Sequence, residues 1–395
     1  MQSICEDKMC AGCMACVDAC PKDAIAVLER LEYYTPSIDQ SKCIDCGRCT
    51  AVCQQCNPPQ GSKPSKWLQG WDSNSESRGT SSSGGLAAAI IRGFISAEGV
   101  VCSCCFRDGQ FGFEFSSSIA DAVKYKGSKY VKSNPIGSYA RIKKLLVEGK
   151  EVLFVGLPCQ VASLKNFVGN KLLSNLYTVD LICHGTPSPA ILRQFLSENG
   201  IDMNQLESIE FRSKGSFQLR ENERTIDLPG VLDGYTVAFL AGLDYTENCY
   251  HCRYASIERV SDVTLGDSWG TNLTEEMRRG VSLVLIQNQK GQRLIDLAGA
   301  ELMTVDIETA IKNNGQLRSP SEKPSARARF FEDLSCGRSI TDAVRRSLPK
   351  RYFKQSLKRL LIRIGLLKRA GGGYGIKVSL APDSNPLHYI KGSIQ

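Results

Sequence analysis

Two runs of four cysteines dominate the first sixty residues of this 395-residue chain. The runs are Cys10-x2-Cys13-x2-Cys16-x3-Cys20-Pro21 and Cys43-x2-Cys46-x2-Cys49-x3-Cys53. This doubled spacing is typical of segments that hold two [4Fe–4S] clusters, in which the fourth cysteine of each run ligates the other cluster. We therefore expect one cluster on Cys10, Cys13, Cys16 and Cys53, and a second on Cys43, Cys46, Cys49 and Cys20.

A disulfide scaffold and a pair of zinc sites are the alternatives. Disulfides need an oxidising compartment, whereas the N-terminus Met1-Gln2-Ser3-Ile4-Cys5 has neither the basic nor the apolar region of a signal peptide. Zinc ribbons use two CxxC pairs rather than two triplets, each with a trailing fourth cysteine. The pattern thus favours clusters, and Cys5 and Cys56, which lie outside the runs, are expected to be spare thiols.

Length, hydropathy and charge limit the number of domains and the classes of protein to which the chain can belong. A chain of 395 residues exceeds the usual size of one core, so we expect two or three domains. No apolar run approaches the length of about 20 residues that spans a bilayer. Residues 340–395 carry twelve Lys and Arg and two Asp. The net charge of this segment therefore exceeds the net charge of the whole chain, which is +8. A basic tail on a nearly neutral body indicates a local electrostatic contact rather than nucleic-acid binding.

Apolar strands and helical segments alternate after the cysteine runs. Residues 151–156 and 177–182 are continuous apolar runs, typical of strands buried on both faces, and residues 160–167 between them have helical spacing. This order predicts an α+β cluster module followed by an α/β domain with a mixed sheet and helices on its faces. Further expected elements are strands at 99–102, 208–211, 261–265 and 282–287, a hairpin turn at 108–109, and helices at 140–149 and 290–299.

A segment rich in Ser and Gly, Arg78–Gly85, precedes an expected helix that starts at Leu86. Serines are good N-caps, and hydroxyl groups, glycine backbone and a helix N-terminus together favour a phosphate group. The segment has neither the Gly-Lys-Ser/Thr of a P-loop nor a GxGxxG pattern. A flexible linker is therefore the alternative to an anion-binding loop at Ser81, Ser82, Ser83, Gly84 and Gly85.

Four later cysteines form a second candidate metal centre. Cys159 and Cys183 follow two consecutive expected strands, at the sheet edge where ligands collect in α/β folds. Cys249 and Cys252 form a CxxC pair. Four thiolates can close a third [4Fe–4S] cluster, with buried thiols beside a redox dithiol, or a zinc ion, as the alternatives.

Two polar residues near these cysteines and strands are candidates for catalysis and for ligand binding. His184, next to Cys183, is the candidate catalytic residue, with a hydrogen-bonding role beside the metal as its alternative. Asp267 lies just after the expected strand 261–265, where a carboxylate can bind a ribose hydroxyl or stabilise a loop.

Several motifs together resemble those of the family of coenzyme F420 hydrogenase/dehydrogenase beta subunits. They are Ser82-Ser83-Gly84-Gly85, Gly156-Leu157-Pro158-Cys159-Gln160, Asp180-Leu181-Ile182-Cys183-His184-Gly185, Cys249-x2-Cys252 and Gly266-Asp267-Ser268-Trp269-Gly270. The resemblance covers about residues 1–330, including the ferredoxin module that many members carry. It implies FAD near Ser81–Gly85 and near residues 126–132, and a cluster on the four later cysteines. Lys126, Lys129 and Tyr130 are the next flavin-site candidates, with a solvated basic turn as the alternative.

The resemblance implies an iron–sulfur flavoprotein oxidoreductase. Such an enzyme would pass electrons between a ferredoxin-like partner and a two-electron acceptor, which could be a small molecule or a deazaflavin. A non-catalytic electron-transfer subunit of a larger redox or polysaccharide-biosynthesis complex is the alternative function.

We expect four segments in a cytoplasmic protein that can also be peripheral at the inner membrane face. They are a two-cluster ferredoxin domain (1–58), a linker (59–75), an FAD and iron–sulfur domain (76–335) and a basic amphipathic extension (336–395). In the extension, interleaved basic and aliphatic residues indicate a surface helix that packs on its own domain or contacts an anionic membrane or protein partner.

Overall fold

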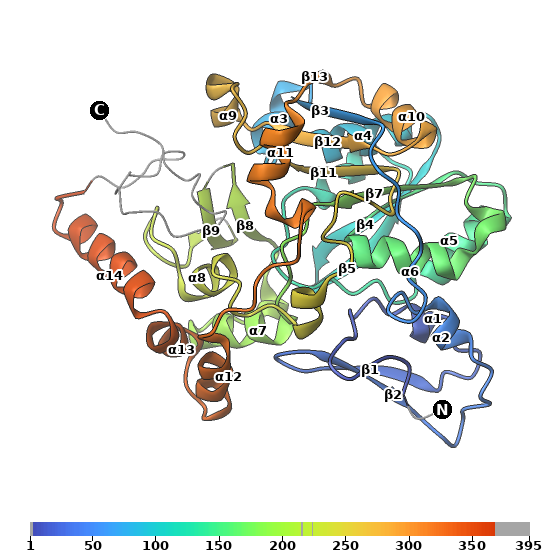
Figure 1. The fold of residues 1–395 in the computed structure, drawn as a ribbon. Helices are drawn as coiled ribbons and strands as arrows, with labels where there is room; N and C mark the ends of the chain where they lie inside the picture. Colours follow the sequence, from blue (N-terminus) through green and yellow to red (C-terminus); the bar gives the residue numbers. More distant parts are fainter. Residues whose placement is uncertain (1–2, 215, 223, 368–395) are drawn as a thin grey trace.

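The computed structural model describes residues 3–214, 216–222 and 224–367. Its centre is an eight-stranded mixed sheet (Figure 1). Four neighbouring strands are parallel, and antiparallel strands complete both edges. In spatial order the strands are β13 (Glu301–Thr304), β3 (Lys66–Trp71), β12 (Ser282–Ile286), β11 (Val263–Asp267), β7 (Leu176–Leu181), β6 (Val152–Val155), β4 (Val100–Arg107) and β5 (Gln110–Ser116). The expected mixed sheet is thus confirmed.

Helices cover both faces of this sheet because its central strands are apolar on both sides. One face packs on α4 (Leu86–Ser96) and α10 (Gln289–Ala298). The other packs on α5 (Ser138–Val147), α6 (Pro158–Val168) and α11 (Ile307–Asn313). The strand β7 illustrates the pattern, since Val179 faces the first set of helices while Leu176 faces the second.

The N-terminal module lies against α5 and α6 (Figure 1). Its elements are α1 (Ala15–Asp18), the antiparallel strands β1 (Ile25–Glu29) and β2 (Tyr34–Ile38), and α2 (Arg48–Val52). Asp18 fixes the contact, because its carboxylate accepts hydrogen bonds from the backbone N–H groups of Gly137 (2.7 Å) and Tyr139 (3.1 Å) at the start of α5. A carboxylate at a helix N-terminus is favourable for both hydrogen bonding and the helix dipole.

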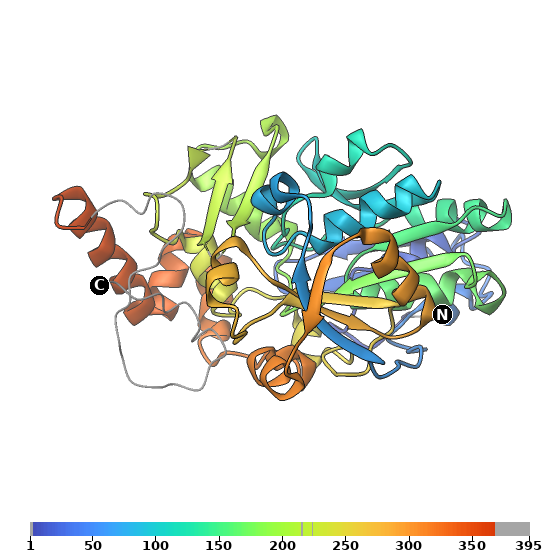
Figure 2. The ribbon, with the colours of Figure 1, turned by 90° about the horizontal axis from the view of Figure 1, so that it is seen from above.

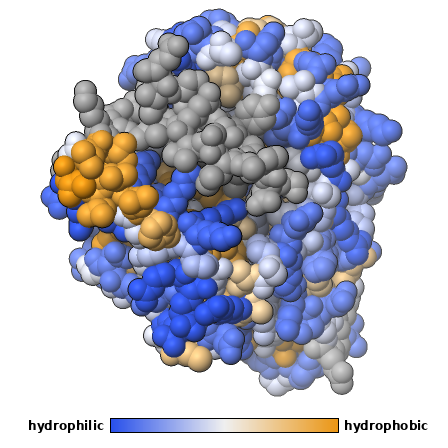
Figure 3. Space-filling model, turned by 60° about the vertical axis from the view of Figure 1, so that its left-hand side comes forward, coloured by the Kyte–Doolittle hydropathy of each residue, from blue (hydrophilic) through white to orange (hydrophobic). Residues whose placement is uncertain are grey.

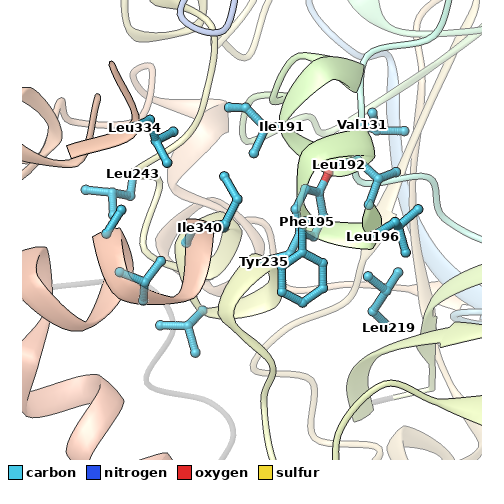
Figure 4. Close-up of a cluster of buried hydrophobic side chains, with 14 of the residues drawn as sticks. Val131, Ile191, Leu192, Phe195, Leu196, Leu219, Tyr235, Leu243, Leu334 and Ile340 are labelled. Carbon is cyan, nitrogen blue, oxygen red and sulfur yellow. The ribbon is translucent and has the colours of Figure 1, made fainter. Parts of the chain in front are cut away.

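A second lobe lies beside the large sheet, as the view from above shows (Figure 2). It contains a small antiparallel sheet and helices around one apolar cluster, in which Phe195, Tyr235 and Ile340 meet (Figure 4). Its elements are α7 (Pro189–Glu198), β8 (Ile209–Ser213), β9 (Ser216–Glu221), β10 (Arg224–Thr225), α8 (Gly234–Leu240), α12 (Arg327–Ser335), α13 (Ile340–Ser347) and α14 (Pro349–Arg363). The short connecting elements are α3 (Ser75–Thr80), α9 (Thr274–Arg279), η1 (Ala120–Tyr125), η2 (Asn170–Leu172), η3 (Met203–Gln205), η4 (Glu247–His251) and η5 (Gly315–Leu317).

The expected linker and the expected C-terminal extension both contribute elements to the folded lobes. The strand β3 lies inside the large sheet although it falls within the expected linker 59–75. The helix α13, from the expected extension 336–395, buries Ile340, Ala343 and Val344 in the second lobe. Residues 368–395 of that extension lie outside the described residues. The domain boundaries themselves stay predictions. Among the described helices, none is long and apolar enough to span a lipid bilayer.

Candidate functional site

The eight cysteines of the two N-terminal runs line two separate hollows. Cys53, at the end of α2, joins the triplet of the first run, and Cys20, after α1, joins the triplet of the second. The first hollow is lined by Cys10, Cys13, Cys16 and Cys53, and the second hollow by Cys20, Cys43, Cys46 and Cys49. These are the two predicted ligand sets; ligation itself stays a prediction.

The backbone around these thiols is arranged to stabilise negative charge on sulfur. The N–H groups of Gly12 and Ala24 donate to the Sγ atoms of Cys10 (3.4 Å) and Cys20 (3.3 Å). Hydrogen bonds to cluster sulfurs are one of the means by which proteins set a cluster's reduction potential. Cys5, which we expected to be a spare thiol, also lines the first hollow.

The four later cysteines, far apart in sequence, line a third hollow. Cys159 is at the start of α6, Cys183 follows β7, and Cys249 and Cys252 lie on and just after η4. Backbone contacts hold these loops together, since Thr246 N donates to Thr186 O (3.0 Å). Within the described part of the chain, no group of three His, Cys, Asp or Glu side chains was found that could hold a single metal ion. The third cluster stays a prediction, with a donor set of four thiols to hold it.

The three hollows follow one another toward a large cavity. The side chains of Cys16 and Cys53 in the first hollow belong to the same group of packed hydrophobic side chains as Cys20 and Cys49 in the second hollow. Ala11, Gln54 and Gln55 line both the first and the third hollow. Leu157, Cys183, His184, Gly185, Thr186 and Pro320 line both the third hollow and the large cavity.

A buried lysine, Lys132, lies between the first and third hollows. Its Nζ donates to Ala11 O (3.1 Å) and lies 5.7 Å from the ring centre of Tyr34. Burial opposes its charge, but Cys249 and Cys159 outweigh this effect and raise the pKa of Lys132 above its usual value. Lys132 falls within the range 126–132 that we expected near FAD, but its position between two sets of cysteines was not predicted, because a lone lysine carries no signal for it.

The large cavity has a volume of about 1000 Å³, at the upper end of the range for ligand sites. It lies at the carboxyl ends of β6, β7 and β11, where α/β folds bind their ligands. Every candidate flavin-site residue lines it except Gly84, and so does the catalytic candidate His184.

The serines of the Ser81–Gly85 loop do not cap α4, contrary to our expectation. Gly85 is the N-cap, with a left-handed φ of +88°, and it provides no side-chain hydrogen bond. The serine hydroxyls bond elsewhere: Ser81 Oγ donates to Ser77 O (2.7 Å), and Ser82 Oγ accepts from Ser128 N (2.9 Å). The first N–H groups of α4 are therefore left without a side-chain cap, at residues that line the cavity.

Gly84 holds this loop against the large sheet. A Cβ at this position would lie 2.5 Å from Gly70 O and 2.7 Å from Ser282 N, so only glycine fits between β3 and β12. Behind the loop, Lys214 Nζ donates to Ser83 O (3.2 Å). Burial, and then the nearby Arg78 and Arg212, lower the pKa of Lys214 to about 8. Cationic side chains thus lie behind the loop, and two of them, Arg78 and Arg212, are themselves paired with Glu276 and Asp267.

Lys126, Lys129 and Tyr130 form another part of the cavity wall. Lys126 Nζ donates to Thr80 Oγ1 (2.9 Å), beside the Ser81–Gly85 loop. Lys129 Nζ donates only to the backbone oxygens of Tyr125 and Lys126 (both 2.8 Å), and it has no carboxylate partner among the described residues. Burial lowers its pKa. An incompletely compensated cation on a cavity wall fits an anionic or strongly polar ligand.

Aromatic rings complete the wall on the side of Tyr130. The ring of Tyr130 stacks on Phe239, with 4.3 Å between ring centres, and on Phe217 at 5.8 Å. The sequence analysis missed these two phenylalanines, since they come from the second lobe. Such a surface fits a flat, partly apolar ring system.

Asp267 and His184 lie on the remaining walls. Both carboxylate oxygens of Asp267 accept hydrogen bonds from Arg212 (2.6 and 3.0 Å), so a ribose hydroxyl would share this carboxylate with an ion pair. His184 is exposed to the cavity and otherwise enclosed by protein, and this burial lowers its pKa. The catalytic role of His184 and the ribose-binding role of Asp267 stay predictions.

Two family models match the chain. Residues 149–310 match the C terminus of the beta subunit of coenzyme F420 hydrogenase/dehydrogenase, and residues 9–56 match a 4Fe-4S dicluster domain. The first match contains all four cysteines of the third hollow, and the second contains the eight cysteines of the N-terminal runs.

Three known proteins are similar to all or part of this chain. The F subunit of the F(420)H(2) dehydrogenase of Methanosarcina mazei is 21% identical over 338 residues, which are 80% of this chain and 90% of that protein. The B subunit of the ion-translocating oxidoreductase complex of Methanosarcina acetivorans is 42% identical over 55 residues, 14% of this chain and 19% of that protein. A chain in the structure of the F420-reducing [NiFe] hydrogenase complex from Methanosarcina barkeri has a TM-score of 0.46 at 15% identity, over 79% of this chain and 98% of that one. The resemblance inferred from the sequence is thus confirmed: residues 149–310 match the C terminus of the beta subunits of coenzyme F420 hydrogenase/dehydrogenase, and residues 9–56 match a 4Fe-4S dicluster domain.

Proposed function

We propose that this iron–sulfur oxidoreductase is also a flavoprotein. It would pass electrons between a ferredoxin-like one-electron partner and a two-electron acceptor or substrate, in either direction. The observation that supports this most directly is the succession of the second hollow, the first hollow, the third hollow and the large cavity, in which neighbouring spaces share or pack their lining residues.

The bound groups would supply the redox chemistry, with single-electron transfer by the clusters and exchange between one-electron and two-electron chemistry by FAD. The residues of the chain hold and orient these groups. Twelve thiols would hold three clusters. The N-terminus of α4, with Lys126 and the Ser81–Gly85 loop, favours a pyrophosphate group. Tyr130 and Phe239 offer the flat wall for an isoalloxazine ring, with Lys129 close by.

The second hollow is the proposed entry point for the one-electron partner. Cys46 is exposed there, and the neighbouring Ile44 is 57% exposed although it is apolar. An apolar side chain beside an exposed cysteine ligand suits a transient protein contact. The opposite end of the succession, the large cavity, would receive the two-electron substrate.

A deazaflavin is the first substrate to test. The family is named for coenzyme F420, and the relative from M. mazei belongs to an F(420)H(2) dehydrogenase. The cavity wall carries Arg318, Lys323 and Arg351, which favour an anionic substrate. His184, between the third hollow and the cavity, is the proposed catalytic candidate.

Anaerobic metal and flavin analysis of the purified chain tests the proposal. We expect about twelve irons per chain, from three clusters of four irons, and one FAD whose reduced form is reoxidised by the correct substrate. Clusters without flavin would favour the alternative, a non-catalytic electron-transfer subunit of a larger redox or polysaccharide-biosynthesis complex. The M. mazei relative is named as one subunit of a dehydrogenase, which is compatible with that alternative.

Lys132 provides a sharper test of the first and third hollows. Replacing it in the variant Lys132→Met removes a buried positive charge beside both thiol sets at similar side-chain volume. A nearby cation stabilises the more negative, reduced cluster, so the variant should lower the reduction potentials of these two clusters by tens of millivolts, an order-of-magnitude expectation from charge interactions in a protein interior. A redox titration followed by low-temperature paramagnetic resonance measures the shift.

The matched control is Lys129→Met. Lys129 is also enclosed but lines the large cavity and none of the three cysteine hollows. Its removal should leave the cluster potentials nearly unchanged and weaken flavin retention. Equal cluster potentials in Lys132→Met and the parent chain would contradict the proposed position of Lys132 between two clusters.

A further inference from the structure

The helix α14 is attached to the second lobe through polar side chains. Gln355 accepts a hydrogen bond from Leu232 N (3.0 Å), Lys358 donates to Gly230 O, and Arg359 pairs with Asp227 (Nε–Oδ1 3.0 Å). These three residues lie on consecutive turns and face the loop that follows β10. Ile362, one turn farther, is buried on the same side.

The opposite side of α14 is apolar and exposed. Phe353, Leu357, Leu360 and Ile364 are 67%, 44%, 53% and 57% exposed. Their spacing of four, three and four residues places them on one stripe of a helix. Figure 3 shows a compact group of apolar side chains on this side of the molecule, with hydrophilic ones beside and below it. The side that faces the protein is thus largely polar, with Tyr352 and Ile362 as its apolar contacts, and an apolar stripe faces outward.

The charge of α14 has one sign. Between Pro349 and Arg363 there are six Lys or Arg and no Asp or Glu. Arg359 pairs with Asp227. By contrast, Lys350, Lys354 and Arg363 have no carboxylate partner among the described residues, whereas Arg351 lines the large cavity.

From these observations we infer that the outer face of α14 docks on an anionic phospholipid surface. An apolar stripe alone would suit any apolar partner, but a stripe flanked by unpaired cations complements acyl chains below negatively charged headgroups. The helix would lie in the plane of the membrane, and Gln355, Lys358 and Arg359 would keep it fixed to the enzyme. This inference is independent of the proposed flavin chemistry.

Vesicle flotation with the full chain tests the inference. The chain should float with vesicles of phosphatidylcholine and phosphatidylserine but not with phosphatidylcholine alone, and binding should weaken with added salt. The variant Phe353→Asp/Leu360→Asp should bind the anionic vesicles at least about tenfold more weakly, since it places two charges in the apolar stripe. The variant Lys350→Gln/Lys354→Gln should weaken binding and reduce its dependence on salt.

The matched control is Ile136→Asp/Val147→Asp. Both are exposed apolar side chains, Ile136 just before α5 and Val147 at its end, and α5 lies on the side of the molecule opposite α14 (Figure 1). This variant should bind anionic vesicles as the parent chain does. Iron content and far-ultraviolet circular dichroism equal to those of the parent establish that each variant is folded.

Three outcomes would overturn the inference. The first is a parent chain that does not float with anionic vesicles. The second is equal loss of binding in the α5 control, which would mean a general surface effect. The third is a dimer in light scattering that dissociates in Phe353→Asp/Leu360→Asp, because the stripe would then be covered by a second copy of the chain.

Discussion

Replacing Cys249 in the variant Cys249→Ser is expected to lower the iron content of the purified chain from about twelve to about eight atoms. Cys249 is buried in the third hollow, where its Sγ lies 3.4 Å from Thr246 Oγ1. A serine hydroxyl is a poor substitute for a thiolate toward iron, so the loss should be confined to this centre. The paramagnetic signal of the reduced N-terminal clusters should persist, because their cysteines line two other hollows.

The proposed electron path would give this variant a second readout. Flavin reduction by a protein donor should be lost, whereas reduction by a small chemical reductant that enters the cavity should remain. Cys336→Ser is the control, since this exposed thiol follows α12 and lines none of the hollows. Unchanged iron in Cys249→Ser, or a parent chain with about eight irons and one zinc, would reject the third cluster.

The elements that could be predicted from the sequence are those whose surroundings are uniform. The runs at 151–156 and 177–182 correspond to β6 and β7, because strands buried on both faces need continuous apolar residues. The hairpin at Asp108-Gly109 joins β4 and β5, with both turn residues at positive φ. Four cysteines at the ends of strands or in a CxxC pair also lie together, because the topology brings strand ends to one edge.

The parts that the sequence analysis missed depend on tertiary contacts. The strand β3 contains Gly70, which weakens a strand pattern, yet the glycine is required there because a Cβ would lie 2.0 Å from Glu301 O on β13. The helix α13 had a usable signal in Ile340, Ala343 and Val344, but the surrounding charges made it look like part of a basic tail. The contacts of Lys132 and the stacking of Tyr130 on Phe239 carried no signal in the sequence, since their partners are distant in sequence.

The buried ion pair between Arg259 and Asp180 is expected to be the most sensitive polar contact in the fold. The two side chains are 1% and 0% exposed, and Arg259 Nη2 lies 3.1 Å from Asp180 Oδ1. The guanidinium also donates to Tyr254 O (2.6 Å), Leu181 O (2.9 Å) and Thr264 Oγ1 (3.2 Å). It therefore connects the segment after Cys252 to the end of β7, just before Cys183.

The variant Arg259→Met should lower the free energy of unfolding by about 3–5 kcal/mol, because it leaves the Asp180 carboxylate buried without a counter-charge. The double variant Asp180→Leu/Arg259→Met should lose less, since replacing both partners by apolar groups removes the uncompensated charge. The control is Arg293→Met, which breaks a half-exposed pair with Glu151 (44% and 31% exposed) and should cost about 1 kcal/mol or less.

Anaerobic urea unfolding, followed by circular dichroism and by loss of cluster absorbance, measures all three variants. In Arg259→Met the absorbance of one cluster should disappear at lower urea than the helical signal, because Cys183 and Cys252 lie on the two segments that the guanidinium joins. Simultaneous loss of both signals, at the midpoint of the Arg293→Met control, would mean that Arg259 neither stabilises the fold nor holds these segments together. A double variant less stable than Arg259→Met would mean that packing around the guanidinium, rather than charge compensation, is its main contribution.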